Sequence, residues 1–202
     1  NEFIVENEKT ARRFIKRVCP KKSLPDLILH PLNKFTDPAD IPSFLNSCLE
    51  GKIVGLLSEA GCPAIADPGA DVVKIAHDKN IQVRPLVGPS SILLAMMGSG
   101  FNGQNFSFNG YLPIDKGERK ATIKRLEKIS FEFSQSQIFI ETPYRNNKML
   151  EDLSTILHPN TKICIACDIT LPTELIISKT ASYWKKNPED LHKKPTIFII
   201  QK

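Results

Sequence analysis

The chain has 202 residues, of which 41% are hydrophobic and 24% are charged, and its formal net charge is +5. These values are ordinary for a globular protein, and the length allows one large domain or two smaller ones with a core that needs no disulfides. The sequence has no apolar run long enough to span a bilayer, and its mildly basic charge is compatible with a polyanionic partner without requiring one. We therefore expect a soluble cytoplasmic protein that does not associate with a membrane.

The five cysteines are an odd number spread along the chain, which favours a reducing compartment over a disulfide framework. Cys164 and Cys167 form a C-x-x-C pair inside the apolar run 162–167, which is typical of a buried strand. Residues three apart on a strand face opposite sides, so this pair is not expected to bind a metal ion. The four histidines are scattered and form no i,i+4 pair, so we expect no metal site.

The first half of the chain alternates predicted strands with predicted helices. The predicted strands lie at 2–6, 52–57 and 81–86, with a short apolar run at 27–29, and the predicted helices lie at 8–18, 41–50, 71–79 and 92–97. This alternation is typical of a parallel sheet with right-handed helical crossovers, in which ligands bind at the carboxyl ends of the strands. Because the chain opens abruptly on a strand, we expect the natural protein to begin upstream with a further first strand.

The second half has consecutive strands without intervening helices, which predicts a mixed sheet. The predicted strands lie at 106–112, 137–141, 162–167, 174–178 and 196–200, and the predicted helices lie at 118–129, 146–157 and 180–184. A polar, glycine-containing segment at 102–105 suggests the boundary. We therefore predict an N-terminal α/β domain at residues 1–103, with a parallel sheet and flanking helices, and a C-terminal α/β domain with a mixed sheet at residues 104–202.

The long turn 58–69 is the strongest indication of a ligand site, because it holds two prolines, two glycines and two acids between a buried strand and a helix. Glycine lets backbone approach a ligand closely, and proline reduces the entropy lost on binding. The turn is longer than an ordinary strand-to-helix connection, which favours a function. Glu59 can accept hydrogen bonds from ribose hydroxyls or an ammonium group. For Asp67 we prefer a structural role as the cap of the following helix.

Two further turns carry polar groups. Val87–Ser91 places the hydroxyls of Ser90 and Ser91 and free N–H groups at a helix start, which suits an anion but is equally an ordinary N-cap. The run from Glu141 to Arg145 ends a strand with a carboxylate and a guanidinium, which can orient a hydroxyl and hold a phosphate. A capped helix start with a surface ion pair explains this run as well.

Lysine and arginine cluster at 12–22, 116–128 and 185–194. For each cluster a solvated helix face is the simpler interpretation, and a surface for a polyanion is the alternative.

Five motifs follow one another along the chain. They are Leu-Leu-Ser-Glu-Ala-Gly-Cys-Pro-Ala-Ile-Ala-Asp-Pro-Gly at 56–69, Pro-Leu-Val-Gly-Pro-Ser-Ser at 85–91, Phe-Asn-Gly-Tyr-Leu-Pro at 108–113, Lys-Gly-Glu-Arg at 116–119 and Phe-Ile-Glu-Thr-Pro-Tyr-Arg at 139–145. In this order they resemble the tetrapyrrole methylase superfamily, and within it the branch of ribosomal RNA small subunit methyltransferase I. The resemblance covers nearly the whole chain.

The resemblance implies two α/β domains that bind S-adenosylmethionine in the cleft between them, release S-adenosylhomocysteine and form a homodimer. It implies the following cofactor contacts: Gly61, Cys62, Pro63, Ile65, Ser90, Ser91, Thr142, Ala166, Pro195 and Thr196. The branch methylates a ribose 2′-hydroxyl of a cytidine in small-subunit RNA, which makes ribosomal RNA or the small ribosomal subunit the expected partner. Glu141 and Arg145 are the candidate catalytic residues for such an acceptor.

The chain departs from the branch at several positions. Glu59 stands where the branch has aspartate, Cys62 stands where it has threonine, and Asp168–Pro172 replaces an Arg-Glu-Leu-Thr-Lys run. The opening strand, its Thr-Pro-Ile-Gly-Asn turn and the C-terminal extension of the branch are not in this sequence, so we expect a short, divergent member. Two alternatives are methylation of a tetrapyrrole or other small molecule, and a non-catalytic homologue that keeps the cofactor fold.

Overall fold

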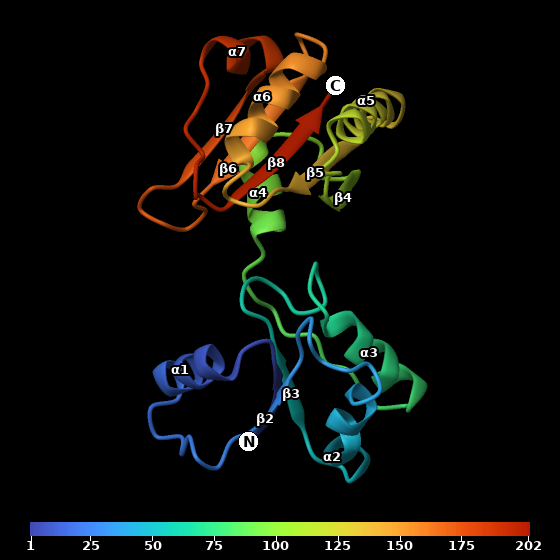
Figure 1. Ribbon diagram of the computed structural model, residues 1–202, viewed down its shortest axis with the longest axis vertical. Coiled ribbons are helices and arrows are strands. Elements are labelled where there is room, and N and C mark those ends of the chain that lie inside the picture. Colours follow the sequence, from blue (N-terminus) through green and yellow to red (C-terminus); the bar gives the residue numbers. More distant parts are fainter. The chain divides into compact units, whose positions relative to one another are not determined.

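The computed structural model describes residues Asn1 to Lys202. The chain divides into two compact units, Asn1–Pro89 and Ser90–Lys202 (Figure 1). This division precedes residue 103, because the helix α4 (Ser91–Ser99) packs against three strands of the second unit's sheet. Ala95 and Met96 of α4 are buried in the cluster on that sheet, so the helix belongs to the second unit.

The first unit is built on a parallel sheet, as its strand–helix alternation predicted. Its strands, in the spatial order β2-β1-β3, are β1 (Glu2–Val5), β2 (Ile28–Pro31) and β3 (Val54–Leu57). Its helices are α1 (Glu8–Val18), the 3-10 helix η1 (Ile41–Leu45), α2 (Asn46–Leu49) and α3 (Gly69–Asp78). Ile4, Phe44 and Val72 belong to the apolar cluster that joins sheet and helices.

The segment 81–90 corrects one prediction. Residues 81–86 were predicted to form a strand, but they pair with no strand and have no regular secondary structure. Ile81 and Val83 do pack against the core of the first unit, which explains the alternating pattern. Pro85 lacks the N–H that a strand needs for its ladder, and Leu86 and Val87 are exposed.

The second unit contains the predicted mixed sheet, in the spatial order β4-β5-β8-β6-β7. Its strands are β4 (Phe106–Tyr111), β5 (Ser136–Ile140), β6 (Lys162–Cys167), β7 (Leu175–Thr180) and β8 (Thr196–Gln201). Its further helices are α5 (Lys116–Phe133), α6 (Asn146–Ile156) and α7 (Ala181–Lys186). β4 pairs with β5 in parallel, and every other pair in the sheet is antiparallel.

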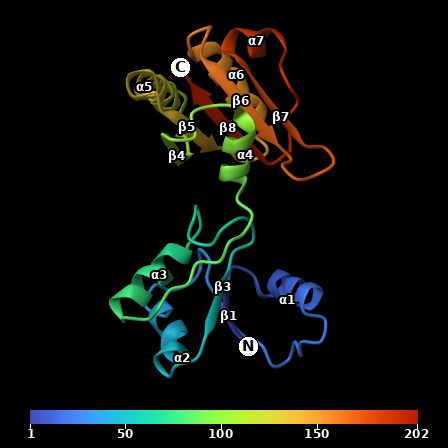
Figure 2. The same ribbon diagram turned by 180° about the vertical axis from the view of Figure 1, so that it is seen from behind.

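Helices cover both faces of the second sheet, so its central strands are fully buried (Figures 1 and 2). Residues of α5, α6 and α7 join the cluster on one face, and residues of α4 join the cluster on the other. Cys167 belongs to the first cluster and Cys164 to the second, which confirms that this pair faces opposite sides of the strand. No helix in the chain has the length and apolarity needed to cross a membrane.

Candidate functional site

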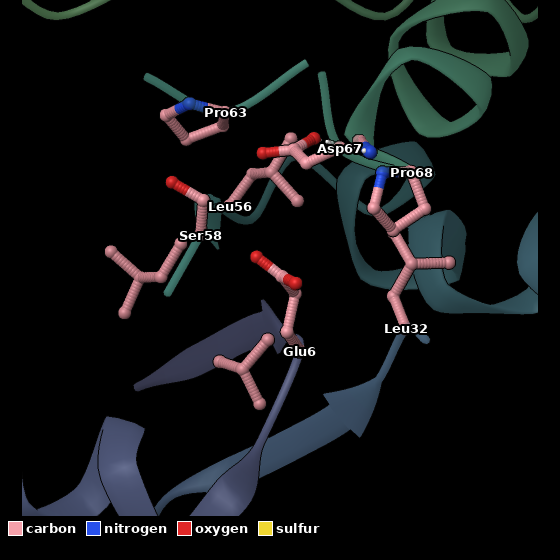
Figure 3. Close-up of a pocket in the computed structure, with 10 residues that line it drawn as sticks. Glu6, Leu32, Leu56, Ser58, Pro63, Asp67 and Pro68 are labelled. Atoms are coloured by element: carbon pink, nitrogen blue, oxygen red, sulfur yellow. Dashed lines mark hydrogen bonds between the residues drawn. The ribbon is translucent and has the colours of Figure 1, made fainter. Parts of the chain in front are cut away.

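The loop 58–69 begins where β3 ends, beside the carboxyl end of its parallel neighbour β1. Residues that follow the two strands therefore meet, and they line a small pocket that includes Glu6, Ser58, Pro63 and Asp67 (Figure 3). The cavity volume is about 10 Å³, close to the space that one water molecule needs. The pocket is therefore large enough for a single donor group, such as an ammonium or a hydroxyl.

Asp67 braces the loop through one carboxylate oxygen. Its Oδ1 accepts hydrogen bonds from the N–H groups of Ala64 and Gly69, both at 2.7 Å. Gly69 is the first residue of α3, so Asp67 binds a free N–H of the helix start as the sequence suggested, although Pro68 occupies the N-cap position itself. The second oxygen, Oδ2, is buried and has no hydrogen-bond partner. A buried acceptor without a partner costs about 1–3 kcal/mol, so Oδ2 is a natural acceptor for a ligand's donor.

Two alanines of the loop have left-handed backbone conformations, with φ of 68° at Ala64 and 60° at Ala66. For a residue with a Cβ this conformation costs about 1–2 kcal/mol, and such strain clusters at binding sites. Ile65 lies between the two alanines and is exposed. Gly61 and Pro63 are exposed as well, and Cys62 is half-buried with its Sγ 3.6 Å from the carbonyl oxygen of Pro89. The backbone of 61–65 is thus presented at the surface.

Glu59 ties the loop to the start of α1. Its N–H donates to Oε1 of Glu6 at 2.8 Å, and its own Oε1 accepts a hydrogen bond from the hydroxyl of Thr10. This oxygen therefore has a protein partner, unlike the free acceptor that the sequence suggested.

The second unit brings four of its predicted cofactor contacts to one edge of its sheet. β8 is antiparallel to both β5 and β6, so it begins where these strands end. Ala166 of β6 pairs with Ile197, and its neighbour Cys167 pairs with Thr196. The N–H of Asp168 continues the ladder to the carbonyl oxygen of Pro195 at 3.0 Å. Thr142 follows the end of β5 at the same edge.

Glu141 and Arg145 form a tight pair at this edge. Arg145 donates to Oε1 of Glu141 from Nη2 at 2.6 Å and from Nε at 3.1 Å. The Glu141 side chain is 3% exposed and the Arg145 side chain 36% exposed. The guanidinium is therefore the accessible partner, and the carboxylate lies beneath it.

Ser90 and Ser91 stand at the start of α4, which lies at the end of the second sheet where β8 begins (Figures 1 and 2). The Ser90 hydroxyl accepts from the N–H of Leu93 at 3.5 Å, so Ser90 is the N-cap. Ser91 is exposed at the first position of the helix.

Asn146, at the first turn of α6, is a residue that the sequence did not single out. It is completely buried, and its Nδ2 donates to the carbonyl oxygen of Lys194 at 2.7 Å. Its Oδ1 has no partner. The chain has only two such buried side-chain atoms without a partner, and the other is Asp67 Oδ2. Both residues are close in sequence to predicted cofactor contacts, Asp67 to Ile65 and Asn146 to Thr142.

The buried thiols near this edge are not nucleophiles. Burial raises the pKa of Cys164, and burial also raises the pKa of Cys167, which lies next to Thr196. Both therefore stay protonated near neutral pH, and the thiolate is the reactive form.

Comparison with known proteins gives the site its context. No family model matches the chain. Ribosomal RNA small subunit methyltransferase I of Buchnera aphidicola is 32% identical over 176 residues, covering 86% of this chain and 60% of that protein. The protein of the same name from Bacillus subtilis is 33% identical over 172 residues, covering 84% of this chain and 56% of that protein. This chain thus spans at most 60% of these two relatives.

Solved structures have the same fold over nearly the whole chain. The methyltransferase CobJ aligns with a TM-score of 0.59 at 16% identity, covering 99% of this chain and 93% of that chain. The cobalt precorrin-4 methyltransferase CbiF aligns with a TM-score of 0.54 at 9% identity, covering 99% of this chain and 94% of that chain. Both comparisons support the resemblance of this chain to the tetrapyrrole methylase superfamily.

The resemblance to the tetrapyrrole methylase superfamily explains why the two-unit α/β fold was predictable from ordered motifs. The motifs at 56–69 and 139–145 coincide with the strained loop of the first unit and the β5 edge of the second. The resemblance did not extend to Asn146, whose significance rests on its burial and its free oxygen.

Proposed function

We propose that the protein transfers a methyl group from S-adenosylmethionine to a ribose 2′-hydroxyl of small-subunit ribosomal RNA. The observation that carries this proposal is the 32–33% identity to proteins named ribosomal RNA small subunit methyltransferase I over more than four-fifths of this chain. A structural neighbour, the uroporphyrin-III C-methyl transferase of Thermus thermophilus, is known in complex with S-adenosylhomocysteine, which supports the cofactor. A ribosomal substrate implies a cytoplasmic location, and the homodimer stays a prediction.

The donors and acceptors of the chain fit this cofactor. S-adenosylmethionine carries a carboxylate, to which the exposed backbone of 61–65 in the first unit, or the hydroxyls of Ser90, Ser91 and Thr142 in the second unit, can donate hydrogen bonds. It also carries an ammonium, ribose hydroxyls and an adenine amine, and the unpartnered oxygens Asp67 Oδ2 and Asn146 Oδ1 suit such donors. We therefore keep the predicted contacts, including Ala166, Pro195 and Thr196, and propose the two oxygens in addition.

The cofactor supplies an electrophilic methyl group on a sulfonium, so the chain's task is to align the acceptor oxygen and to exclude water. Arg145 is the group that can stabilise negative charge developing on that oxygen, because its guanidinium is partly exposed. Glu141 is almost buried and accepts three hydrogen bonds on one oxygen, from Arg145 and from the Thr142 N–H. We propose that Glu141 positions Arg145, while Arg145 faces the acceptor.

A methylation assay tests the proposal. The full-length protein and tritiated S-adenosylmethionine are incubated with small ribosomal subunits from cells that lack the gene, and labelled RNA is digested to nucleosides. The expected result is one 2′-O-methylated nucleoside, with transfer falling steeply as salt rises. Transfer to a tetrapyrrole instead, or calorimetry that finds S-adenosylhomocysteine bound without any transfer, would contradict the proposal and support one of the two alternatives.

A further inference from the structure

The positive charge of the protein is concentrated in one short segment. Residues 8–22 contain seven basic residues and one acidic residue, a net charge of +6. The remaining residues contain 20 basic and 21 acidic residues, a net charge of −1. The +5 charge of the chain therefore lies on α1 and the turn that follows it, both in the first unit.

Most of these basic side chains have no acidic partner. Arg12 is held by the carbonyl oxygen of Leu24 at 2.6 Å and lies 3.7 Å from Glu8, and Lys16 donates to the carbonyl oxygen of Pro20 at 2.7 Å. The six without an ion pair are Lys9, Arg13, Lys16, Arg17, Lys21 and Lys22. All of these except Lys22 are exposed. The surface they form is named the α1 basic surface below.

The α1 basic surface is not what helix stability alone would select. Lys9, Arg13 and Arg17 follow one another at i,i+4 spacing, and each like-charge pair destabilises a helix by about 0.2–0.5 kcal/mol. α5 contains such a run as well, at Lys116, Lys120, Lys124 and Lys128, but it also has three acidic residues and an ion pair between Lys128 and Glu132. α1 has a single acidic residue, Glu8, so its positive charge is less compensated than that of α5.

The structure fixes α1 next to the candidate site in the same unit. Asn7 caps the helix by accepting from the N–H groups of Lys9 at 2.9 Å and Thr10 at 3.2 Å. Thr10 in turn donates to Glu59, the second residue of the loop 58–69. A ligand bound along α1 thus lies beside the start of the loop 58–69.

The surface also carries apolar groups that suit nucleotides. Phe14 is 54% exposed and Val18 is 55% exposed, at i,i+4 spacing beside Arg13 and Arg17. Exposed aromatic rings among basic residues are typical of single-stranded nucleic acid surfaces. A membrane-binding helix needs a wide free apolar face, whereas the central apolar residues of α1, including Ile15, are buried in the protein.

We propose that the α1 basic surface docks the phosphate backbone of an RNA substrate and holds it beside the loop 58–69. The turn after α1 adds to the surface, because Cys19, Pro20, Lys21 and Lys22 line a shallow open hollow. The proposal rests on the proposed RNA substrate and deepens it by naming the surface that recognises the backbone. It replaces, for this segment alone, the interpretation of a solvated helix face.

The experiment compares two triple variants of the full-length protein. Arg13→Gln, Arg17→Gln and Lys21→Gln remove three charges from the α1 basic surface, and Lys120→Gln, Lys124→Gln and Arg125→Gln remove three exposed charges from α5. Glutamine has a helix propensity close to those of lysine and arginine. Binding of a fluorescent oligouridine is followed by anisotropy over a series of salt concentrations, and binding of S-adenosylhomocysteine by calorimetry.

The α1 variant is expected to bind oligouridine about tenfold or more weakly at low salt. The slope of log K against log salt should fall by about 2, since each phosphate contact with a single strand contributes about 0.7. The α5 variant should match the parent, and all three proteins should bind S-adenosylhomocysteine equally. Equal salt slopes in both variants would overturn the proposal, as would oligouridine binding that stays intact while binding to phosphatidylserine vesicles is lost.

The cofactor measurement separates this inference from the proposed function. If the parent binds S-adenosylhomocysteine but not oligouridine, the docking surface is refuted while methyl transfer to another acceptor stands. If the parent binds oligouridine through α1 but does not bind S-adenosylhomocysteine, the docking surface stands and the methyltransferase proposal fails.

Discussion

Arg145 donates two hydrogen bonds to a single oxygen of Glu141, and the N–H of Thr142 donates a third to the same atom at 2.6 Å. These three hydrogen bonds converge on one carboxylate oxygen and fix the orientation of the guanidinium. Glu141 therefore holds the guanidinium of Arg145 in place at the end of β5. Substitutions of the two residues should have different effects on activity and stability.

We expect Arg145→Ala to reduce methyl transfer strongly and to lower the free energy of unfolding by about 1–2 kcal/mol, because it leaves a nearly buried carboxylate with one donor. Glu141→Gln should retain more activity, since an amide oxygen can still accept from Arg145. Urea unfolding and initial rates measure both effects. Lys128→Ala breaks an exposed pair with Glu132 and is the control, with an expected change below about 0.5 kcal/mol. Unchanged turnover in both site variants would remove the pair from the mechanism.

Ala66→Gly is expected to stabilise the first unit by about 0.5–1 kcal/mol. Glycine relieves the left-handed strain at φ of 60°, and this gain exceeds its greater entropy loss on folding. Calorimetric melting measures the effect, and S-adenosylhomocysteine affinity should fall if the strain holds the loop in its binding shape. Ala70→Gly, four residues on in α3, should destabilise by about 0.5–1 kcal/mol. The same sign for both substitutions would show that the loop is not strained.

Elements with a strong local pattern could be predicted from the sequence, and elements that depend on a partner could not. The strand Lys162–Cys167 was predicted with its observed bounds, because a short apolar run between two turns is typical of a buried strand. The segment 81–86 has a similar pattern, yet it forms no strand, because packing of Ile81 and Val83 requires no ladder and Pro85 opposes one.

Only the parts of the candidate site that lie within the sequence motifs could be predicted. The turn at 58–69 and the contact of Asp67 with the helix start follow from local residue chemistry. The free oxygens of Asp67 and Asn146 do not, because they arise from burial by residues distant in the sequence. The charge of α1 was visible in the sequence, but its lack of acidic partners required the structure.

Gly55→Ala should destabilise the first unit by about 1–3 kcal/mol. A Cβ at Gly55 would lie 2.6 Å from Cδ1 of Phe3, its partner across β1 and β3. Because β3 leads directly into the loop 58–69, S-adenosylhomocysteine affinity should weaken as well. Adding Phe3→Leu should restore part of the stability. Gly103→Ala, which meets no atom within 4 Å, is the matched control and should change stability little. A neutral Gly55→Ala would mean that the Phe3 ring moves aside at little cost.

Thiol labelling should distinguish the cysteines by burial. Cys19 is exposed, whereas burial raises the pKa of Cys164 and of Cys167. We expect iodoacetamide to label Cys19 in the native protein and to label the two β6 thiols at least about a hundredfold more slowly, as read by peptide mass spectrometry.

The folded state holds the thiol protons of Cys164 and Cys167 more tightly than the unfolded state. Their contribution to stability is therefore complete below the ordinary thiol pKa of about 8.5 and is lost as the pH rises above it. The free energy of unfolding should fall with pH in this alkaline range, and less so in a Cys164→Ala and Cys167→Ala variant. Labelling of all three thiols at one rate would contradict the burial of β6.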